Sequence, residues 1–397
     1  MPRVTLLILV LGLLLTLLSI VSDLLVFYRL RKSSKRVSNW HKYSSWLLAI
    51  FMVVSIFIFI FNTQNLISIR WVLLVYLLLS LPKIILLLLW SSSLGIAWLL
   101  KQKAPQWLFY TYMAVAVGVL GMLLEGAFIA RKQLSVKRIT VQSTRLPSSF
   151  NHFRVVQISD LHLGHFIGNE DFIRRCVDSI NALHPDIIVQ TGDLVSYRTS
   201  EINTFVPILS KLRATYGVYS ILGNHDYGDY VTWDTPAAKQ KNNAEMLAVQ
   251  KKMGWVLLNN THLSIVNSNN DSIALLGTEN WGHPPFKQYG SLSAARKGVN
   301  SQLFQILLTH NPVLWDAQVL EKTNIDLTLS GHTHASQAKF GSFSPSQFKY
   351  KEWDGLYQTM HQQFLYVNPG LGTIMIPIRV WDATPEITVI DLENKVK

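Results

Sequence analysis

Four long apolar blocks limit the possible folds of this chain more than any other feature. They are Val4–Leu30, Ser45–Phe61, Trp71–Leu100 and Leu108–Ala130. A helix needs about 20 mostly apolar residues to cross the hydrocarbon core of a bilayer, and each block comes near or exceeds that length. Because backbone groups inside a bilayer must be hydrogen-bonded within the segment, each block is expected to be helical. The sequence therefore predicts a transmembrane anchor of four helices over residues 1–130.

The first block also has one feature of a signal peptide, since Arg3 precedes a leucine-rich run. Its apolar core is too long for a signal peptide and lacks a small-residue cleavage site. Three more blocks follow it. We therefore interpret it as a true membrane span.

The third block, Trp71–Leu100, is longer than one crossing requires. Pro82 lies inside it, so we expect either a kink there or a first part that lies in the interface. Lys83, Asp23 and Glu125 are the ionisable residues within the blocks. Such residues usually face other helices or each other, but snorkelling near the span ends is the simpler explanation, and we favour it over a polar pathway.

The basic charge of the chain lies mainly beside these blocks. Residues 1–130 hold 11 Lys/Arg and 2 Asp/Glu, which accounts for +9 of the formal net charge of +12. Basic residues that flank membrane spans do not form a nucleic-acid footprint, so no nucleic-acid binding is expected. If the loop after the first block is cytoplasmic, 8 Lys/Arg lie on the cytoplasmic side and 6 on the other. The positive-inside rule then predicts that the remaining domain is extracytoplasmic.

Residues 131–397 have a mixed globular composition. We expect a hinge and a first edge strand over 131–150, and one large domain over 151–397. Strands are predicted at Phe153–Ser159, Ile187–Gln190, Gly217–Ile221, Gln305–Leu308, Ile325–Leu329, Phe364–Val367 and Ile387–Leu392. Helices are predicted at Asn169–Leu183 and Thr204–Ala214. This alternation indicates an α/β sheet that presents ligands at the carboxyl ends of its strands.

Five of the predicted strands end in residues that can bind a metal ion. These residues are Asp160 and His162, Asp193, Asn224 and His225, His310, and His332 and His334. Each motif alone has an ordinary explanation as a turn, a helix cap or a core histidine. The whole set, each after an apolar strand, instead indicates a metal site. Cys176 is the only cysteine, and oxygen and imidazole ligands without thiolate suit Mn, Fe, Zn or Mg.

These motifs resemble the calcineurin-like metallophosphoesterase superfamily. They are Asp160-x-His162, Gly192-Asp193, Gly223-Asn224-His225-Asp226, His310 and Gly331-His332-x-His334. The closing segments Leu371–Arg379 and Pro385-Glu-Ile-Thr are similar to the bacterial membrane-associated branch, the YkuE-like and YaeI-like phosphoesterases. The resemblance implies a four-layer α/β/β/α sandwich with mixed sheets and a two-metal centre on one edge. It also implies a multi-pass protein of the bacterial inner membrane.

The resemblance further implies a role for each ligand. Asp160, His162 and His334 would bind the first divalent cation, while Asn224, His310 and His332 would bind the second and Asp193 would bridge them. Mn²⁺ is the metal expected to support activity in vitro. A hydroxide between two such cations would attack the phosphorus of a phosphoester. His225 would protonate the leaving oxygen, and Asp226 would orient His225.

Some positions depart from related subfamilies. Ser196 stands where a purple acid phosphatase would have its tyrosine, so a ferric tyrosinate centre is not expected. His225 stands where lipid A pathway pyrophosphatases typically carry Arg, which argues against that activity. Ala335 replaces a glycine that commonly follows the second histidine motif, and we expect a small backbone adjustment there. His165 could touch the substrate, although a surface position is the simpler interpretation.

The sequence therefore predicts a membrane-anchored hydrolase of phosphodiesters, or of lipid-linked phosphoesters or pyrophosphates. Two alternatives stay open. One is a sensing or transport-associated protein whose metal domain binds phosphoryl ligands without hydrolysis. The other is a cytoplasm-facing nucleotide phosphatase. A further segment, Phe340–Tyr366, is rich in aromatic residues and could form a lid or touch lipid headgroups, although packing against the sheet edge is the simpler interpretation.

Overall fold

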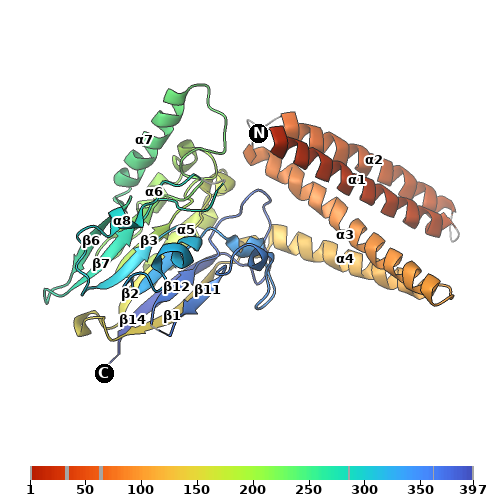
Figure 1. Ribbon diagram of the computed structural model, residues 1–397. Coiled ribbons are helices and arrows are strands. Elements are labelled where there is room, and N and C mark those ends of the chain that lie inside the picture. The colour runs from red at the N-terminus through yellow and green to blue at the C-terminus, as the bar shows by residue number, and fades with distance from the viewer. Residues whose placement is uncertain (1, 32–34, 62–65, 285–286, 361, 396–397) are drawn as a thin grey trace. The chain divides into compact units, whose positions relative to one another are not determined.

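The computed structural model describes residues 2–31, 35–61, 66–284, 287–360 and 362–395. The chain divides into two compact units. One holds the four N-terminal helices, and the other is an α/β domain that begins at Ala130 (Figure 1).

Four long helices form the first unit. They are α1 (Pro2–Arg31), α2 (Lys35–Phe61), α3 (Leu66–Leu99) and α4 (Gln106–Phe128). Each contains a segment long and apolar enough to cross a bilayer. The prediction of four apolar helices is thus confirmed, and they indicate a multi-pass membrane protein. Pro82 lies inside α3, and the kink expected there stays a prediction.

An ion pair lies within the helical unit. Lys83 Nζ is 2.7 Å from Asp23 Oδ2, and the Asp23 side chain is almost fully buried. His41 Nε2 is 3.1 Å from the backbone oxygen of Asp23. Lys83 and Asp23 therefore face each other across α3 and α1, and the snorkelling interpretation is wrong for this pair.

Two six-stranded mixed sheets form the α/β domain. The first has the order β1 (Ser135–Ser143), β14 (Glu386–Asn394), β2 (Phe153–Ile158), β3 (Ile187–Thr191), β4 (Val218–Ile221) and β5 (Val256–Leu257). The second has the order β11 (Gly355–Gln358), β12 (Phe364–Val367), β9 (Leu327–Ser330), β8 (Phe304–Leu308), β7 (Ser272–Gly277) and β6 (Thr261–Val266). A small third sheet pairs β10 (Ala338–Lys339) with β13 (Val380–Trp381). In the first sheet β2, β3, β4 and β5 run parallel, as do β7, β8, β9 and β12 in the second.

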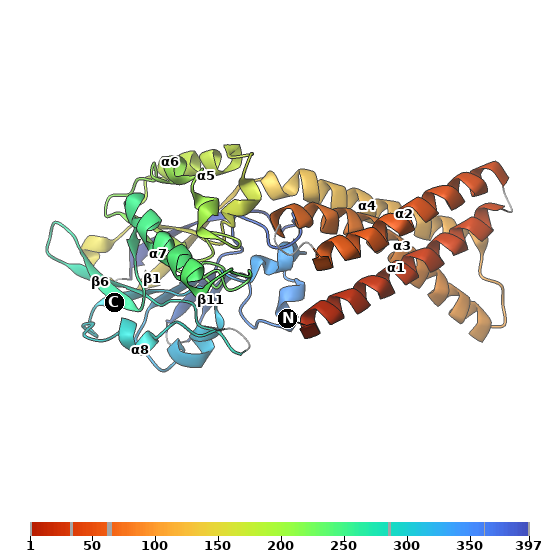
Figure 2. The ribbon, with the colours of Figure 1, turned by 90° about the horizontal axis from the view of Figure 1, so that it is seen from above.

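Successive side chains along a strand point to opposite faces of the sheet, and this separates the hydrophobic cores between the layers of the domain. Along β2, Val155 belongs to the core between the two sheets, whereas Val156 belongs to the core under the helices. That outer core is covered by α5 (Asp171–Ala182), α6 (Val206–Leu209) and α7 (Pro236–Lys252). On the other side, α8 (Leu292–Ala295) and the π-helical turn η5 (Trp315–Val319) pack on the second sheet. The predicted α/β/β/α order is confirmed, and Figure 2 shows the layers from above.

Short 3-10 turns connect these elements. They are η1 (Ala130–Lys132), η2 (Ser148–Phe150), η3 (Leu163–Phe166), η4 (Thr199–Ile202), η6 (His334–Gln337) and η7 (Pro345–Phe348). The helix predicted over Thr204–Ala214 is wrong in length, because only α6 forms there. After α6 the backbone forms a 3-10-type hydrogen bond between residues three apart, from Lys211 N to Ile208 O.

Candidate metal centre

The five predicted strand ends meet at one edge of the two sheets. Asp160 and His162 follow β2, Asp193 follows β3, and Asn224 to Asp226 follow β4. From the second sheet, His310 follows β8, and His332 and His334 follow β9. Because these strands are parallel within each sheet, their carboxyl ends lie at a common edge.

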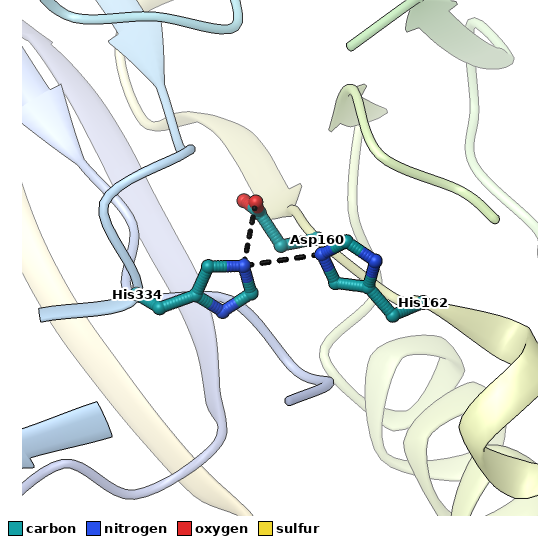
Figure 3. A group of neighbouring side chains, drawn as sticks. All are labelled: Asp160, His162 and His334. Atoms are coloured by element: carbon teal, nitrogen blue, oxygen red, sulfur yellow. Dashed lines mark hydrogen bonds and ion pairs between the residues drawn. The ribbon is translucent and has the colours of Figure 1, made fainter. Parts of the chain in front are cut away.

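The first group of ligands is formed by Asp160, His162 and His334 (Figure 3). His334 Nε2 lies 3.2 Å from Asp160 Oδ1 and 3.1 Å from His162 Nε2. All three side chains are buried. Two imidazole nitrogens and a carboxylate oxygen thus point toward one small volume.

The second group contains Asp193, His310 and His332. His310 Nε2 lies 3.2 Å from Asp193 Oδ2 and 3.2 Å from His332 Nδ1. Asn224 Oδ1 is 3.0 Å from the same His310 nitrogen. The amide of Asn224 therefore lies beside this group, as the resemblance implies.

Asp193 lies between the two groups. Its Oδ2 atom is 3.2 Å from His310 Nε2 and 3.6 Å from His162 Nε2. Its other oxygen, Oδ1, accepts a hydrogen bond from the backbone N–H of His225 at 2.9 Å. One carboxylate oxygen is thus within reach of both groups, which is the position a bridging ligand needs.

The donor set fits divalent cations. His310 Nδ1 lies 2.8 Å from the carbonyl of Thr191, so a proton on Nδ1 leaves the Nε2 lone pair directed at Asp193 and Asn224. The two facing Nε2 atoms of His162 and His334 cannot both donate to each other. A cation between them would satisfy both lone pairs, and the acid groups would balance its charge.

The two carboxylates are held in the ionised form by their neighbours. Burial would raise the pKa of Asp193, but the charges of His310 and His225 lower it well below its usual range. For the base His310 the effects are reversed. Burial would lower its pKa, but the negative charge of Asp193 raises it to about 9. Burial, followed by repulsion from His310, lowers the pKa of His332 to about 3. Ionised carboxylates and neutral imidazoles are the forms that bind metal ions, so His310 must release its Nε2 proton when a cation binds.

Asp226 has a different role from the predicted one. Its carboxylate accepts backbone N–H bonds from Asp193, Leu194 and Val195 at 2.9–3.1 Å and from Gly223 at 2.8 Å. Among the described residues, no hydrogen bond joins it to the His225 ring. Asp226 therefore fixes the backbone at the end of β3, and the prediction that it orients His225 is wrong.

The carbonyl of Ser196 contacts His225 instead. It lies 2.7 Å from His225 Nδ1, which leaves Nε2 as the nitrogen available for proton transfer. The His225 ring stands edge-on to His162, with ring centres 4.9 Å apart, and lies 4.4 Å from the ring of Tyr230. An imidazole next to the first ligand group can reach a group bound there.

Two tyrosines beside the ligands were not predicted as site residues. Tyr230 OH accepts a hydrogen bond from Asn224 Nδ2 at 2.9 Å, and Tyr350 OH lies 3.0 Å from His332 Nε2. Tyr350 falls in the aromatic segment that the sequence singled out, but no local pattern marks Tyr230. His165, expected at the surface, is buried, with Nδ1 3.3 Å from Thr373 Oγ1.

Ala335 has the backbone that the glycine of related chains would adopt easily. Its φ is 47° and its ψ is 36°, in the left-handed region, and it is fully buried. The four residues from His334 to Gln337 all have positive φ. The expected adjustment is therefore a left-handed turn.

Comparison with known proteins gives a consistent result. Residues 153–336 match the family model described as calcineurin-like phosphoesterase. The chain is 32% identical over 308 residues to the "uncharacterized metallophosphoesterase YkuE" of Bacillus subtilis, covering 74% of this chain and 99% of that protein. It is 30% identical to a "transmembrane protein with metallophosphoesterase domain" of Danio rerio, covering 69% of this chain and 60% of that protein.

Among solved structures, the phosphopantetheinyl hydrolase of Mycobacterium tuberculosis is similar at 17% identity with a TM-score of 0.29. That match covers 45% of this chain and 82% of the hydrolase.

Proposed function

The chain belongs to the calcineurin-like metallophosphoesterases, and from this premise we propose that it is a membrane-anchored hydrolase of phosphoesters that works with two divalent cations. The observation that carries the proposal is the position of Asp193 Oδ2, 3.2 Å from His310 Nε2 and 3.6 Å from His162 Nε2. A carboxylate within reach of both groups of ligands can bridge a pair of cations.

In this proposal Asp160, His162 and His334 hold one cation and Asn224, His310 and His332 hold the other. Asp193 is shared between them. Two bound cations would supply charge neutralisation for a phosphoryl group and a lowered pKa for water between them. Mn²⁺, Fe, Zn²⁺ and Mg²⁺ all suit the donor set, and we expect Mn²⁺ to support activity in vitro.

The residues of the chain supply proton transfer and orientation. Since Ser196 O contacts His225 Nδ1, His225 Nε2 can carry a proton toward the leaving oxygen of the substrate. Tyr350 OH holds the outer nitrogen of His332 and fixes the plane of that ring. Asp226 holds the backbone of Asp193 so that its side chain keeps its position between the groups.

We infer that the catalytic domain is extracytoplasmic, on the charge distribution of the loops between the spans. A phosphatase reporter and a fluorescent reporter fused to the C-terminus test this, because each is active on one side of the membrane. Activity of the cytoplasmic reporter alone would reverse the inference and favour a cytoplasm-facing nucleotide phosphatase.

The main experiment compares variants of the purified full chain. With Mn²⁺, the wild-type chain should hydrolyse bis-p-nitrophenyl phosphate or a lipid phosphoester, and His310→Ala should abolish turnover of both. The matched control is His184→Asn, at an exposed histidine outside the site with a φ of 50°, which asparagine tolerates.

The His184→Asn variant should retain wild-type turnover. Metal binding with no hydrolysis of either substrate by the wild-type chain would refute the proposal and favour a sensing role. His225→Gln separates the two cases further, since it should lower turnover while leaving Mn²⁺ binding intact.

A further inference from the structure

Four aromatic side chains, three of them exposed and Phe340 half-buried, form a surface beside the metal centre. They are Phe340, Phe343, Phe348 and Trp381, which we call the aromatic surface. Phe348 is 81% exposed, Trp381 45% and Phe343 42%. The rings of Phe340 and Trp381 are in contact, and the Phe343 ring centre lies 6.2 Å from that of Phe348. Exposed apolar side chains gathered in this way mark an interaction site.

The segment that carries three of these rings is anchored to the metal-ligand turn. Ser344 Oγ donates to the carbonyl of Ala335 at 2.7 Å, and the hydroxyls of Ser336 and Ser346 are 2.7 Å apart. Ser344 and Ser346 are buried. At the end of the segment, Tyr350 OH lies 3.0 Å from His332 Nε2. The polar side chains thus hold the segment in place while its aromatic rings remain exposed.

The aromatic segment Phe340–Tyr366 has two halves that differ in how they pack. Its second half, with Phe364, packs into the sheet as β11 and β12, so the simpler interpretation holds there. Its first half does not pack in this way, because Phe343 and Phe348 stay exposed.

This surface contacts the segment that follows the last transmembrane helix in the chain. The strand β13, which carries Trp381, contacts η1. η1 follows α4 after a single residue, and the fourth candidate span, Gln106–Lys132, includes both. η1 contains Arg131 and Lys132, and Lys349 directly follows Phe348.

Aromatic side chains mixed with basic ones are typical of residues at the level of lipid headgroups, where the rings are partly apolar and the cations attract anionic lipid. A soluble protein partner would explain the rings, but not the basic residues of η1, which close the fourth candidate span.

We propose that the aromatic surface inserts into the headgroup region of an anionic bilayer. His332 is joined to this segment through Tyr350, so insertion brings the metal centre to the plane in which the phosphoesters of lipids lie. The consequence for substrate choice, a lipid-linked phosphoester, rests on the function proposed above. The insertion itself does not.

Depth-dependent fluorescence quenching tests the insertion without any turnover. Phe348→Cys and Trp381→Cys variants of the full chain are labelled with a bimane dye and placed in vesicles of phosphatidylcholine and phosphatidylglycerol. Cys176 is buried, at 2% exposed, so the wild-type chain should take up little dye. The matched control is Val266→Cys, 50% exposed on β6, the opposite edge strand of the second sheet.

Lipid carrying a nitroxide near the headgroup should reduce the emission at positions 348 and 381 by half or more, and leave that at 266 unchanged. Equal quenching at all three positions, or none at 348 and 381, would overturn the proposal. A blue-shifted emission at 348 without quenching by nitroxide lipid would also overturn it, since a protein would then cover the surface. Quenching is independent of hydrolysis, so an inactive chain that inserts would contradict only the proposed function.

Discussion

Glu201 should be essential for the metal centre although it is not among the ligands. Its Oε2 accepts backbone N–H bonds from Gly164 at 3.1 Å and Ser196 at 2.7 Å. Its Oε1 accepts bonds from Tyr197 at 2.9 Å and Arg198 at 3.0 Å. Gly164 follows His162 by two residues and Ser196 follows Asp193 by three. One buried carboxylate therefore joins the two strand ends that carry three ligands.

The change Glu201→Gln keeps the shape and removes half of the acceptors. The amide oxygen can replace one carboxylate oxygen, but the NH₂ group must then face two backbone N–H groups. Each unsatisfied buried N–H costs about 1–3 kcal/mol, or about 2–6 kcal/mol for the pair. Burial raises the pKa of Glu201, so the neutral amide regains part of that cost. We expect a net loss of about 2–4 kcal/mol, or roughly 4–16 °C in melting temperature.

Thermal unfolding of the full chain in detergent, followed by tryptophan fluorescence, measures this loss. Titration with Mn²⁺ should show weaker binding, because the ends of β2 and β3 would no longer be held together. The control Glu245→Gln changes an exposed carboxylate on α7 and should behave as wild type. If Glu201→Gln melts with the control and binds Mn²⁺ as well, the backbone is held by other contacts and the reasoning is refuted.

Three further predictions concern stability. Lys83→Ala or Asp23→Ala alone should cost about 3–5 kcal/mol and the double variant much less, because a single change leaves a buried charge unpaired; unfolding of all three in detergent measures the difference. Burial raises the pKa of Asp326 to about 6, although the N–H of Gln305 and the charge of Arg145, 3.1 Å away, oppose the rise, so its carboxyl ionises at a higher pH in the folded chain than in the unfolded chain. Stability should therefore fall by about 3 kcal/mol as the pH rises from about 4 to about 6, and pH-dependent unfolding of Asp326→Asn should lack that fall. Ala335→Gly should melt at or above the wild-type temperature, since relief of the left-handed backbone, about 1 kcal/mol, offsets the added freedom of the unfolded chain; clear destabilisation would contradict this.

The features that could be predicted from the sequence are those that depend on neighbouring residues in the chain. An apolar strand followed by Asp160-x-His162 or His332-x-His334 is a local pattern, and parallel strands place their ends together without further information. The four apolar helices follow from length and hydropathy in the same way. The domain boundaries at residues 130 and 150, and the role of each ligand, stay predictions.

What the sequence missed depends on contacts between distant segments. Glu201 lies in the short 3-10 turn η4 and Tyr350 in a loop, and their partners Gly164 and His332 are 37 and 18 residues away. No periodicity marks such a contact. The pairing of Lys83 with Asp23, 60 residues apart, is of the same kind.

The ligands themselves show why these contacts are needed. Five of them have a left-handed backbone, with φ of 50° at Asp160, 46° at His162, 57° at Asp193, 74° at His332 and 51° at His334. Each such residue costs of order 1–3 kcal/mol unless the surroundings impose it. Buried carboxyl groups that are not ligands supply that constraint. Asp226 and Glu201 bind the N–H groups at the end of β3, and Glu201 also binds Gly164.

Arg379 is a third buried residue that fixes the backbone near the ligands, and its charge is opposite to that of a carboxylate. It is fully buried and donates to the carbonyls of Pro369, Gly370 and Gly372. Gly372 N in turn donates to the backbone oxygen of Asp160 at 2.8 Å. Two carboxyl groups thus hold N–H groups of the ligand turns, and the Arg379 cation holds carbonyls of the turn that contacts Asp160. A strained turn would relax if either set of contacts were missing, so the clamping residues are as necessary to the geometry of the metal centre as the side chains that point into it.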